Sequence, residues 1–377
     1  MASLLKAKSL LCIFGAVGIT GTWVRTALDG STEQLMKVMD DPQGRLPGSQ
    51  ALLQRTFTGI RDPMDHIIST LVVFWYEVVD GSHPASTAVA LYFLGQLLPC
   101  ILIAYTNGQR GSKPSLVSYI TSSPTILRSS NAVPLEVLQR VSTLSSPALV
   151  KFLLLPAIVL GYLVPAGLMG IFSSSAGSMA HQTAIGAWNM YPLLILPILY
   201  VLRVVFSSYP VFSTGTSASA SKKVHLHAVR AVNLPAIIFS FAMHFAVVAV
   251  SLVTILFPAI IKPAYLTELH PSAIFVPPLA LPKATTPGDG VKGFLLWDQL
   301  IAYLVVMVVV TLELQSAWTS TQRAGSFCWS WYFPALFMTS LLLGPGTACL
   351  IVSWLRDEIL FGGWIDEKEA KKAADKI

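Results

Sequence analysis

Two acidic residues stand in segments of the sequence that are otherwise apolar and aromatic. Glu77 lies near the end of residues 67–80, which read IISTLVVFWYEVVD, and Asp298 lies in residues 295–303, which read LLWDQLIAY. A charged side chain at bilayer depth costs about 2.5 to 3.5 kcal/mol on insertion scales, so it is usually kept because it faces a bundle interior and has a function. Glu77 and Asp298 are therefore candidate acid catalysts, with an interhelical hydrogen bond as the structural alternative.

Two further residues could take part in proton transfer. Asp80 follows Glu77 by one helical turn, so both side chains share one face of a helix. His244 lies about midway along a long apolar segment. We include both as catalytic candidates, although a solvated position at the membrane surface is the favoured interpretation for Asp80 and for the nearby His83.

The composition indicates which elements position these residues. Hydrophobic residues make up 54% of the 377 residues and charged residues only 12%, which is too apolar for the surface of a soluble domain of this size. Stretches long enough to cross about 30 Å of hydrocarbon recur. The sequence predicts an all-α, polytopic transmembrane helical bundle with about eight spans, at residues 9–28, 64–79, 87–105, 149–172, 190–206, 228–258, 295–314 and 333–355.

The first span, preceded by Lys6 and Lys8, also resembles a signal peptide. No clear small-residue cleavage site follows it, so a retained anchor is the favoured interpretation, and the count becomes seven spans if the segment is cleaved. Pro156 and Pro165, and the triplet Gly344-Pro345-Gly346, are positions where a span could break.

The segments between the spans are polar, and the whole chain reads as one membrane domain, 1–377. We predict polar loops at about 29–61, 107–146, 207–227 and 262–293 and a charged, exposed tail at 356–377, with a short helix near 33–39. Antiparallel second and seventh spans would place Glu77, Asp80 and Asp298 in the same leaflet. At the opposite end, Arg203 and Glu313 would form a structural ion pair, and Asp62 before Pro63 has the pattern of a helix N-cap.

Several reaction classes lack their sequence motifs. The chain has no Walker loop, GxGxxG, G-x-S-x-G or histidine box. Residues 40–45, DDPQGR, lack the third acid of a magnesium-diphosphate motif. His225 and His227 have the spacing of metal ligands but no third ligand nearby, and we place them in a loop beside two lysines. We therefore expect no metal or other cofactor, and the net positive charge is explained by residues flanking the membrane, without nucleic acid.

A carboxylic acid in an apolar, aromatic site suits one kind of reaction. Apolar burial favours the neutral form of the acid, which can then donate a proton. Protonation of an epoxide or a terminal alkene on a polyprenyl chain gives a carbocation, which aromatic faces stabilise and a dry pocket protects from water. A carboxylate can remove the final proton. The pattern predicts terpene cyclisation, with an aromatic lining from Phe74, Trp75, Tyr76, Trp297 and Tyr303.

Two segments carry a resemblance to a known family. Residues 92–110, YFLGQLLPCILIAYTNGQR, and 295–303, LLWDQLIAY, are similar to fungal integral-membrane terpene cyclases of meroterpenoid pathways, particularly the longer type associated with ascochlorin, ascofuranone and macrophorin. The resemblance covers the chain loosely. It implies a farnesylated aromatic or polyketide substrate, a multi-pass location in the endoplasmic reticulum, other enzymes of the same pathway as partners, and no metal or nucleotide. Gln96, in the first segment, joins the substrate-binding candidates.

A different class of function remains open at this stage. In a proton-coupled secondary transporter of a small hydrophobic molecule, Glu77, Asp298 and His244 would form a proton relay. Transporters usually contain an internal repeat with matched broken helices, and we find no repeat in the sequence. A closed apolar pocket reaching Glu77 would favour the cyclase, whereas a polar path through the membrane would favour the transporter.

Overall fold

The computed structural model describes residues 2–59, 63–108, 149–206, 218–321 and 327–362. These residues are predominantly helical and contain no β-strand, which confirms the all-α class. The longer helices are α1 (Ala2–Ile19), α3 (Ser31–Asp40), α4 (Met64–Val79), α5 (Pro84–Gly108), α11 (Val164–Phe172), α12 (Met179–Asn189), α13 (Tyr191–Phe206), α14 (Ala218–Leu256), α17 (Pro287–Ser320), α18 (Trp329–Leu343) and α19 (Pro345–Phe361).

Short helical pieces complete two of the spans and the loop after α14. A π-helical turn (Thr20–Val24) and α2 (Arg25–Leu28) extend α1. Two π-helical turns (Val150–Leu154 and Val159–Leu163) alternate with α10 (Leu155–Ile158) and α11 in the span that contains Pro156 and Pro165, so these prolines widen the helix instead of breaking it. After α14 come α15 (Pro263–Leu266) and α16 (Pro271–Phe275).

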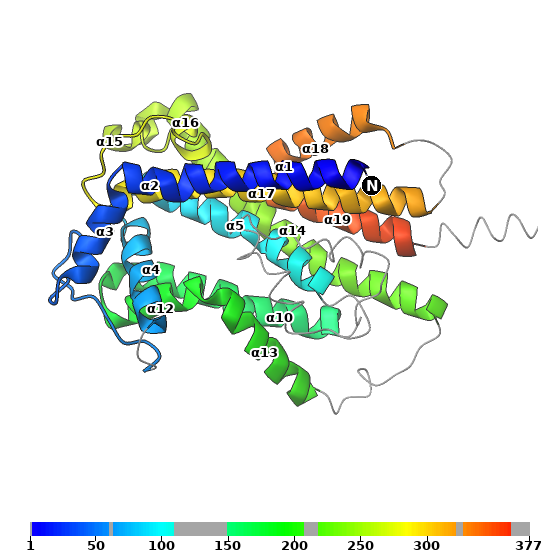
Figure 1. Ribbon diagram of the computed structural model, residues 1–377, viewed down its shortest axis with the longest axis horizontal. Coiled ribbons are helices and arrows are strands. Elements are labelled where there is room, and N and C mark those ends of the chain that lie inside the picture. Colours follow the sequence, from blue (N-terminus) through cyan, green and yellow to red (C-terminus); the bar gives the residue numbers. More distant parts are fainter. Residues whose placement is uncertain (1, 60–62, 109–148, 207–217, 322–326, 363–377) are drawn as a thin grey trace, which may run out of the picture.

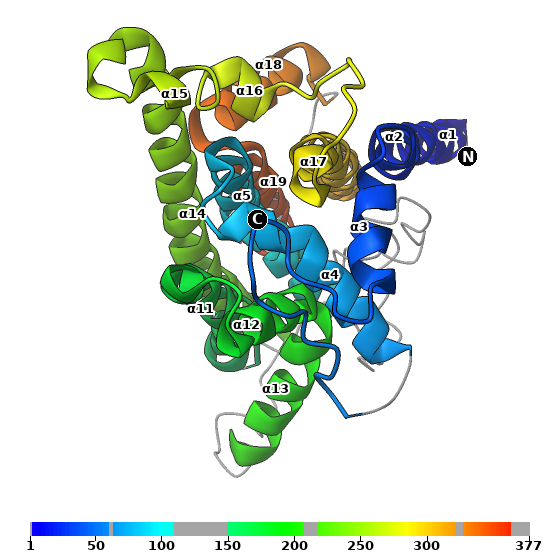
Figure 2. The ribbon, with the colours of Figure 1, turned by 90° about the vertical axis from the view of Figure 1, so that its left-hand side faces the viewer.

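Five continuous helical segments in the described residues are long and apolar enough to cross a membrane, and these fit a membrane protein: Ser9–Leu28, Pro84–Gly108, Val150–Phe172, Lys222–Leu256 and Pro287–Ser320. In both views α17 lies beside α1 and beside the pair α5 and α19 (Figures 1 and 2). The helix α14 packs against α5 and α19 on the other side. The long apolar helices thus form one bundle.

Three of the eight predicted spans have a different form in the structure. The helix α4 has 16 residues, or about 24 Å, which is short of a 30 Å bilayer core, and it runs across the direction of α1 and α17 (Figure 1). The span predicted at 190–206 is α13, which is bent by 79° from α12. The span predicted at 333–355 is broken at Gly344, whose φ of 94° ends α18 before Pro345 begins α19.

The boundaries of the predicted loops also change. The short helix expected near 33–39 is confirmed as α3. However, α17 begins at Pro287, inside the predicted loop 262–293, because the Asp289 carboxylate accepts hydrogen bonds from Thr285 and Thr286 at its N-terminus. The tail predicted from residue 356 is corrected, since α19 continues to Phe361 with Arg356 buried. Residues 109–146, Asp62 and the charged end 363–377 lie outside the described residues.

Candidate active site

Glu77 lies where the last turn of α4 meets the first turn of α17. Its carboxyl group is buried, with the residue only 4% exposed, because Val73 and Val78 of the same helix pack into the core beside it. Glu77 Oε2 accepts the backbone N–H of Gly288 at 2.5 Å. A side chain at position 288 would put its Cβ 2.6 Å from the Glu77 Cβ, so the contact requires glycine. Glu77 therefore also caps the positive end of α17.

His83 approaches the other oxygen of the same carboxyl group. The His83 Nε2 lies 3.5 Å from Glu77 Oε1, and 31% of the His83 side chain is exposed against 5% of the Glu77 side chain. Gly81, with a φ of 88°, lets the chain turn back between α4 and α5. The Asp80 carboxylate holds this turn by accepting hydrogen bonds from the Ser82 backbone N–H and hydroxyl. Asp80 thus shapes the loop that brings His83 back to Glu77.

Further polar residues gather at the start of α17. Buried Asp29 accepts a hydrogen bond from the Ser31 backbone N–H at 2.9 Å, and the Ser31 side chain packs directly on Gly290. Buried Arg25 donates to the carbonyl of Ala280. The sequence interpretation did not include Arg25 or Asp29, because they are separated from α17 by more than 250 positions and only folding brings them together.

Aromatic rings lie on one side of Glu77. Phe74, one turn before it on α4, makes edge-to-face contacts with Trp75 at 5.9 Å and with Phe294 of α17 at 5.2 Å between ring centroids. Trp23 contacts the other side of Phe294 at 5.2 Å. Trp75 continues the row to Trp188 of α12 at 4.7 Å. This row, from four parts of the chain, could stabilise a cation formed near Glu77, and sequence reasoning missed Phe294, Trp23 and Trp188.

Two further aromatic candidates, Tyr76 and Trp297, contact other parts of the chain. Tyr76 is buried against the ring of His181, with centroids 6.0 Å apart. Trp297 donates its Nε1–H to the carbonyl of Pro278 at 3.2 Å and packs on Gly21 of the first span. Both residues therefore anchor neighbouring segments to the helices that carry Glu77 and Asp298.

Asp298 does not lie beside Glu77. Glu77 contacts Gly288, ten positions before Asp298 on the same helix, so the two acids are separated by about 15 Å along α17. Asp298 is half-buried and interacts electrostatically with Tyr303. The Tyr303 hydroxyl is buried and has no hydrogen-bond partner among the described residues. The expectation that Asp298 pairs with Glu77 at one depth is corrected: Asp298 belongs with Tyr303 in the middle of the bundle.

His244 is held in the same middle region. Its Nε2 lies 3.1 Å from the carbonyl of Leu341, so Nε2 carries a hydrogen, and its Nδ1 then accepts from the Tyr92 hydroxyl at 3.3 Å. Both nitrogens are satisfied in the neutral ring. The ring thus ties α14 to α5 and α18.

Gln96 sits where α5, α14 and the break between α18 and α19 meet. Its amide NH₂ donates to the Ser240 carbonyl at 3.0 Å, and its Oε1 accepts the N–H groups of Gly346 at 3.0 Å and Thr347 at 3.3 Å. Gln96 is fully buried. These contacts satisfy the first N–H groups of α19, which would otherwise be buried without partners.

Replacing Gln96 with leucine should therefore destabilise the protein by about 1 to 3 kcal/mol, because three buried backbone groups lose their partner. Unfolding in detergent, followed by circular dichroism, measures this change. Gln54→Leu is the control, since Gln54 lies in a surface segment between α3 and α4 and its side chain bonds in an exposed setting. A Gln96→Leu protein of unchanged stability would contradict this structural role.

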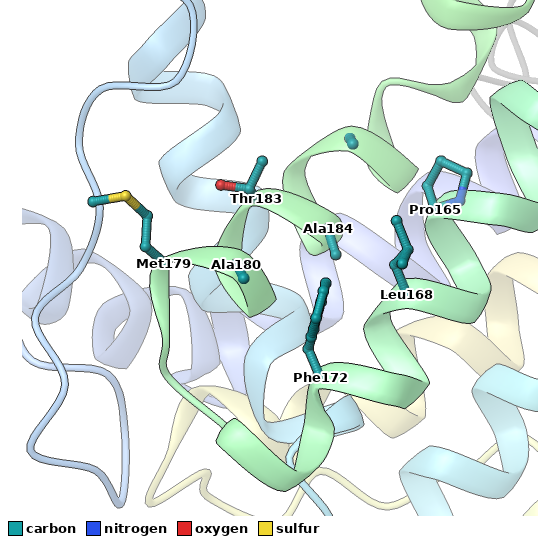
Figure 3. A pocket seen from close by; sticks show the side chains of 8 residues that line it. Pro165, Leu168, Phe172, Met179, Ala180, Thr183 and Ala184 are labelled. Atoms are coloured by element: carbon teal, nitrogen blue, oxygen red, sulfur yellow. The ribbon is translucent and has the colours of Figure 1, made fainter.

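The described residues also form an apolar groove of about 480 Å³ between α11 and α12, lined by Pro165, Leu168, Phe172, Met179, Ala180, Thr183, Ala184 and Ala187. Figure 3 shows Leu168 and Phe172 on one side and Ala180 and Ala184 on the other. None of the predicted catalytic residues lines it. His181 and Trp188 are on a different face of α12, where they contact α4.

A buried charged cluster lies at the far end of the bundle, and it corrects the predicted partner of Glu313. Arg356 of α19 donates to Glu313 of α17, to Asp357 at 2.9 Å and to Asn107 of α5 at 3.1 Å. Arg203 is exposed instead. His225, predicted to lie in a loop, is on α14 with its Nε2 3.9 Å from Asp357. This arrangement supports the structural role expected for Glu313.

Comparisons with known proteins agree with the resemblance seen in the sequence. The chain is 24% identical over 371 residues to "Terpene cyclase penA" of Penicillium crustosum, covering 92% of this chain and 94% of that protein. It is 27% identical over 183 residues to "Terpene cyclase ctvD" of Aspergillus terreus, covering 44% of this chain and 51% of that protein. No solved structure matches. The family model described as the CtvD domain matches residues 7–361, and because this is nearly the whole chain, the protein belongs to the CtvD domain family.

Proposed function

We propose that the protein is a membrane-bound terpene cyclase that protonates the terminal epoxide or alkene of a prenylated, farnesyl-bearing aromatic or polyketide and closes the chain into rings, in fungal meroterpenoid metabolism. Two relatives carry the name terpene cyclase. The single observation that best supports the chemistry is the position of Glu77, a buried carboxyl group beside a row of aromatic rings.

The contacts of Glu77 favour a defined role for each of its oxygens. Glu77 Oε2 already accepts a hydrogen bond from the Gly288 N–H. Oε1 is therefore the oxygen that can carry a proton. Transfer of that proton to the substrate creates a carbocation. We assign its stabilisation to the rings of Phe74, one turn before Glu77 on α4, and of Phe294, which packs on Phe74. Ring closure, followed by loss of one proton, gives a product that is an isomer of the substrate.

Asp298 is the second acid in this proposal. Its distance from Glu77 along α17 and its interaction with Tyr303 suit a separate step, such as accepting the final proton from the cyclised cation. The unpartnered Tyr303 hydroxyl and the Tyr92–His244 pair supply further polar groups in the same region. The names of the relatives support a cyclase over a transporter. We place the enzyme in the endoplasmic reticulum membrane, where other enzymes of the pathway would supply its substrate.

Product analysis tests this function directly. Microsomes from a heterologous host expressing the full chain are incubated with a farnesylated phenol or with its terminal epoxide. The products are then separated by chromatography and their masses are measured by mass spectrometry. We expect a cyclised product of unchanged mass from one of the two substrates. Membranes from the same host without the protein are the control. Recovery of both substrates unchanged at high protein level would overturn the proposal for this substrate class.

A further inference from the structure

We propose that His83 returns a proton to Glu77 after each turnover. This inference rests on the proposed cyclase function and adds a residue to it. If Glu77 gives its proton to the substrate and the final proton leaves through another base, Glu77 is left as a carboxylate. A buried carboxylate needs a route by which a new proton arrives before the next substrate can react.

The geometry points to His83 as that route. The imidazole Nε2 lies 3.5 Å from Oε1, the oxygen of Glu77 that the Gly288 N–H leaves unoccupied. A small rotation of either side chain brings the two atoms within hydrogen-bonding distance. A water molecule that hydrogen-bonds to both atoms can also connect them. The proton would therefore arrive on the same oxygen that delivers it to the substrate.

The exposure of the two side chains sets the direction of transfer. The Glu77 side chain is 5% exposed and the His83 side chain 31% exposed, so of these two side chains His83 has the greater access to solvent. An imidazole is the side chain whose protonation changes most readily near neutral pH. It can thus collect a proton from water and pass it inward.

The charged groups facing His83 come from both helices packed around it. Glu77 approaches from α4, and Asp289 of α17 interacts with it electrostatically. The Asp289 carboxylate is itself fixed by the Thr285 and Thr286 N–H groups at 2.8 and 3.0 Å. Two carboxylates thus face the imidazole, one from each of these helices.

The proton balance of the cycle is complete with these groups. Glu77 loses one proton to the substrate, and the cyclised cation loses one proton either directly to water or to Asp298, which then releases it to water. The His83 imidazolium then gives its Nε2 proton to the Glu77 carboxylate and takes another from water. No net proton is consumed, and the substrate is isomerised.

Rapid mixing with excess substrate separates the first turnover from later ones. For purified His83→Ala in detergent, we expect the first turnover at the wild-type rate, followed by a steady-state rate lower by about 10². Imidazole added to the buffer should restore the steady-state rate, because the space left by the side chain opens to solvent. His66→Ala is the matched control, an exposed histidine on the first half of α4, and should behave as wild type with and without imidazole.

Other outcomes are decisive as well. A wild-type steady-state rate for His83→Ala would mean that Glu77 recovers its proton without His83, and the relay would be wrong. Loss of the first turnover without imidazole rescue would show that His83 only positions Glu77. If the wild-type protein itself cyclises neither substrate, the proposed function fails first, and the relay fails with it.

Discussion

Cyclised product should disappear when Glu77 is replaced with glutamine, with a fall in rate of about 10² to 10⁴, the range expected when a general acid is removed. Glutamine is nearly the same size, and its side-chain oxygen can still accept the Gly288 N–H that Glu77 accepts at 2.5 Å. The capping contact at the start of α17 is therefore preserved while the acidic proton is lost. The measurement is product formed per unit of membrane protein.

Two companion variants complete this test. Glu33→Gln removes an exposed acid that pairs with Lys37 on the surface of α3, and should leave the rate unchanged. Asp298→Asn should also stop product formation if Asp298 accepts the final proton. Undiminished turnover in Glu77→Gln together with loss of turnover in Asp298→Asn would show that Asp298, and not Glu77, is the initiating acid.

The largest effect on stability should come from Arg356→Met. Arg356 is 1% exposed, and it is the cation that Glu313 and Asp357 share, both of them buried. Its removal takes the arginine cation away from two buried carboxylates, which costs about 3 to 5 kcal/mol. Unfolding of the purified protein in mixed detergent is monitored by tryptophan fluorescence. The variant should unfold at a much lower proportion of denaturing detergent than the wild type.

Arg230→Met is the matched control for this change. Arg230 also pairs with a carboxylate of α19, Glu358, at 2.7 Å, but 54% of the arginine side chain is exposed. Water and salt screen that pair, so its loss should cost at most about 1 kcal/mol. Equal losses of stability for Arg356→Met and Arg230→Met would contradict the conclusion that the buried cluster contributes more than the exposed pair. Adding Glu313→Gln to Arg356→Met should recover part of the loss, because one unpaired buried charge is removed.

Much of the fold follows from the sequence because apolar length and helix-breaking residues act locally. The spans at 9–28, 87–105 and 149–172 correspond to helices found in the structure. Gly344-Pro345-Gly346 was a predicted break, and the structure breaks there because Gly344 adopts a positive φ that other residues rarely adopt. The sequence predicts a span from residue 295, whereas α17 begins at Pro287. The prediction starts too late because the capping residues of this helix are polar and resemble a loop.

The candidate site was predictable in part. A buried acid at position 77 with an aromatic neighbour at 74 follows from local composition alone, and the structure places both side chains accordingly. The partners do not follow from composition. The depth predicted for Asp298 assumes that α4 and α17 are antiparallel spans, whereas the axis of α4 runs across the direction of α17 (Figure 1).

By itself, the sequence determined the class of protein and the identity of its acids, because the cost of placing charge among apolar residues is a property of each segment. Only the tertiary structure decided which distant groups meet: Gly288 at Glu77, and Arg356 at Glu313. The physical reason is that such contacts depend on helix crossing angles and helix ends. These are set by packing between residues that are far apart in the chain, which no local pattern records.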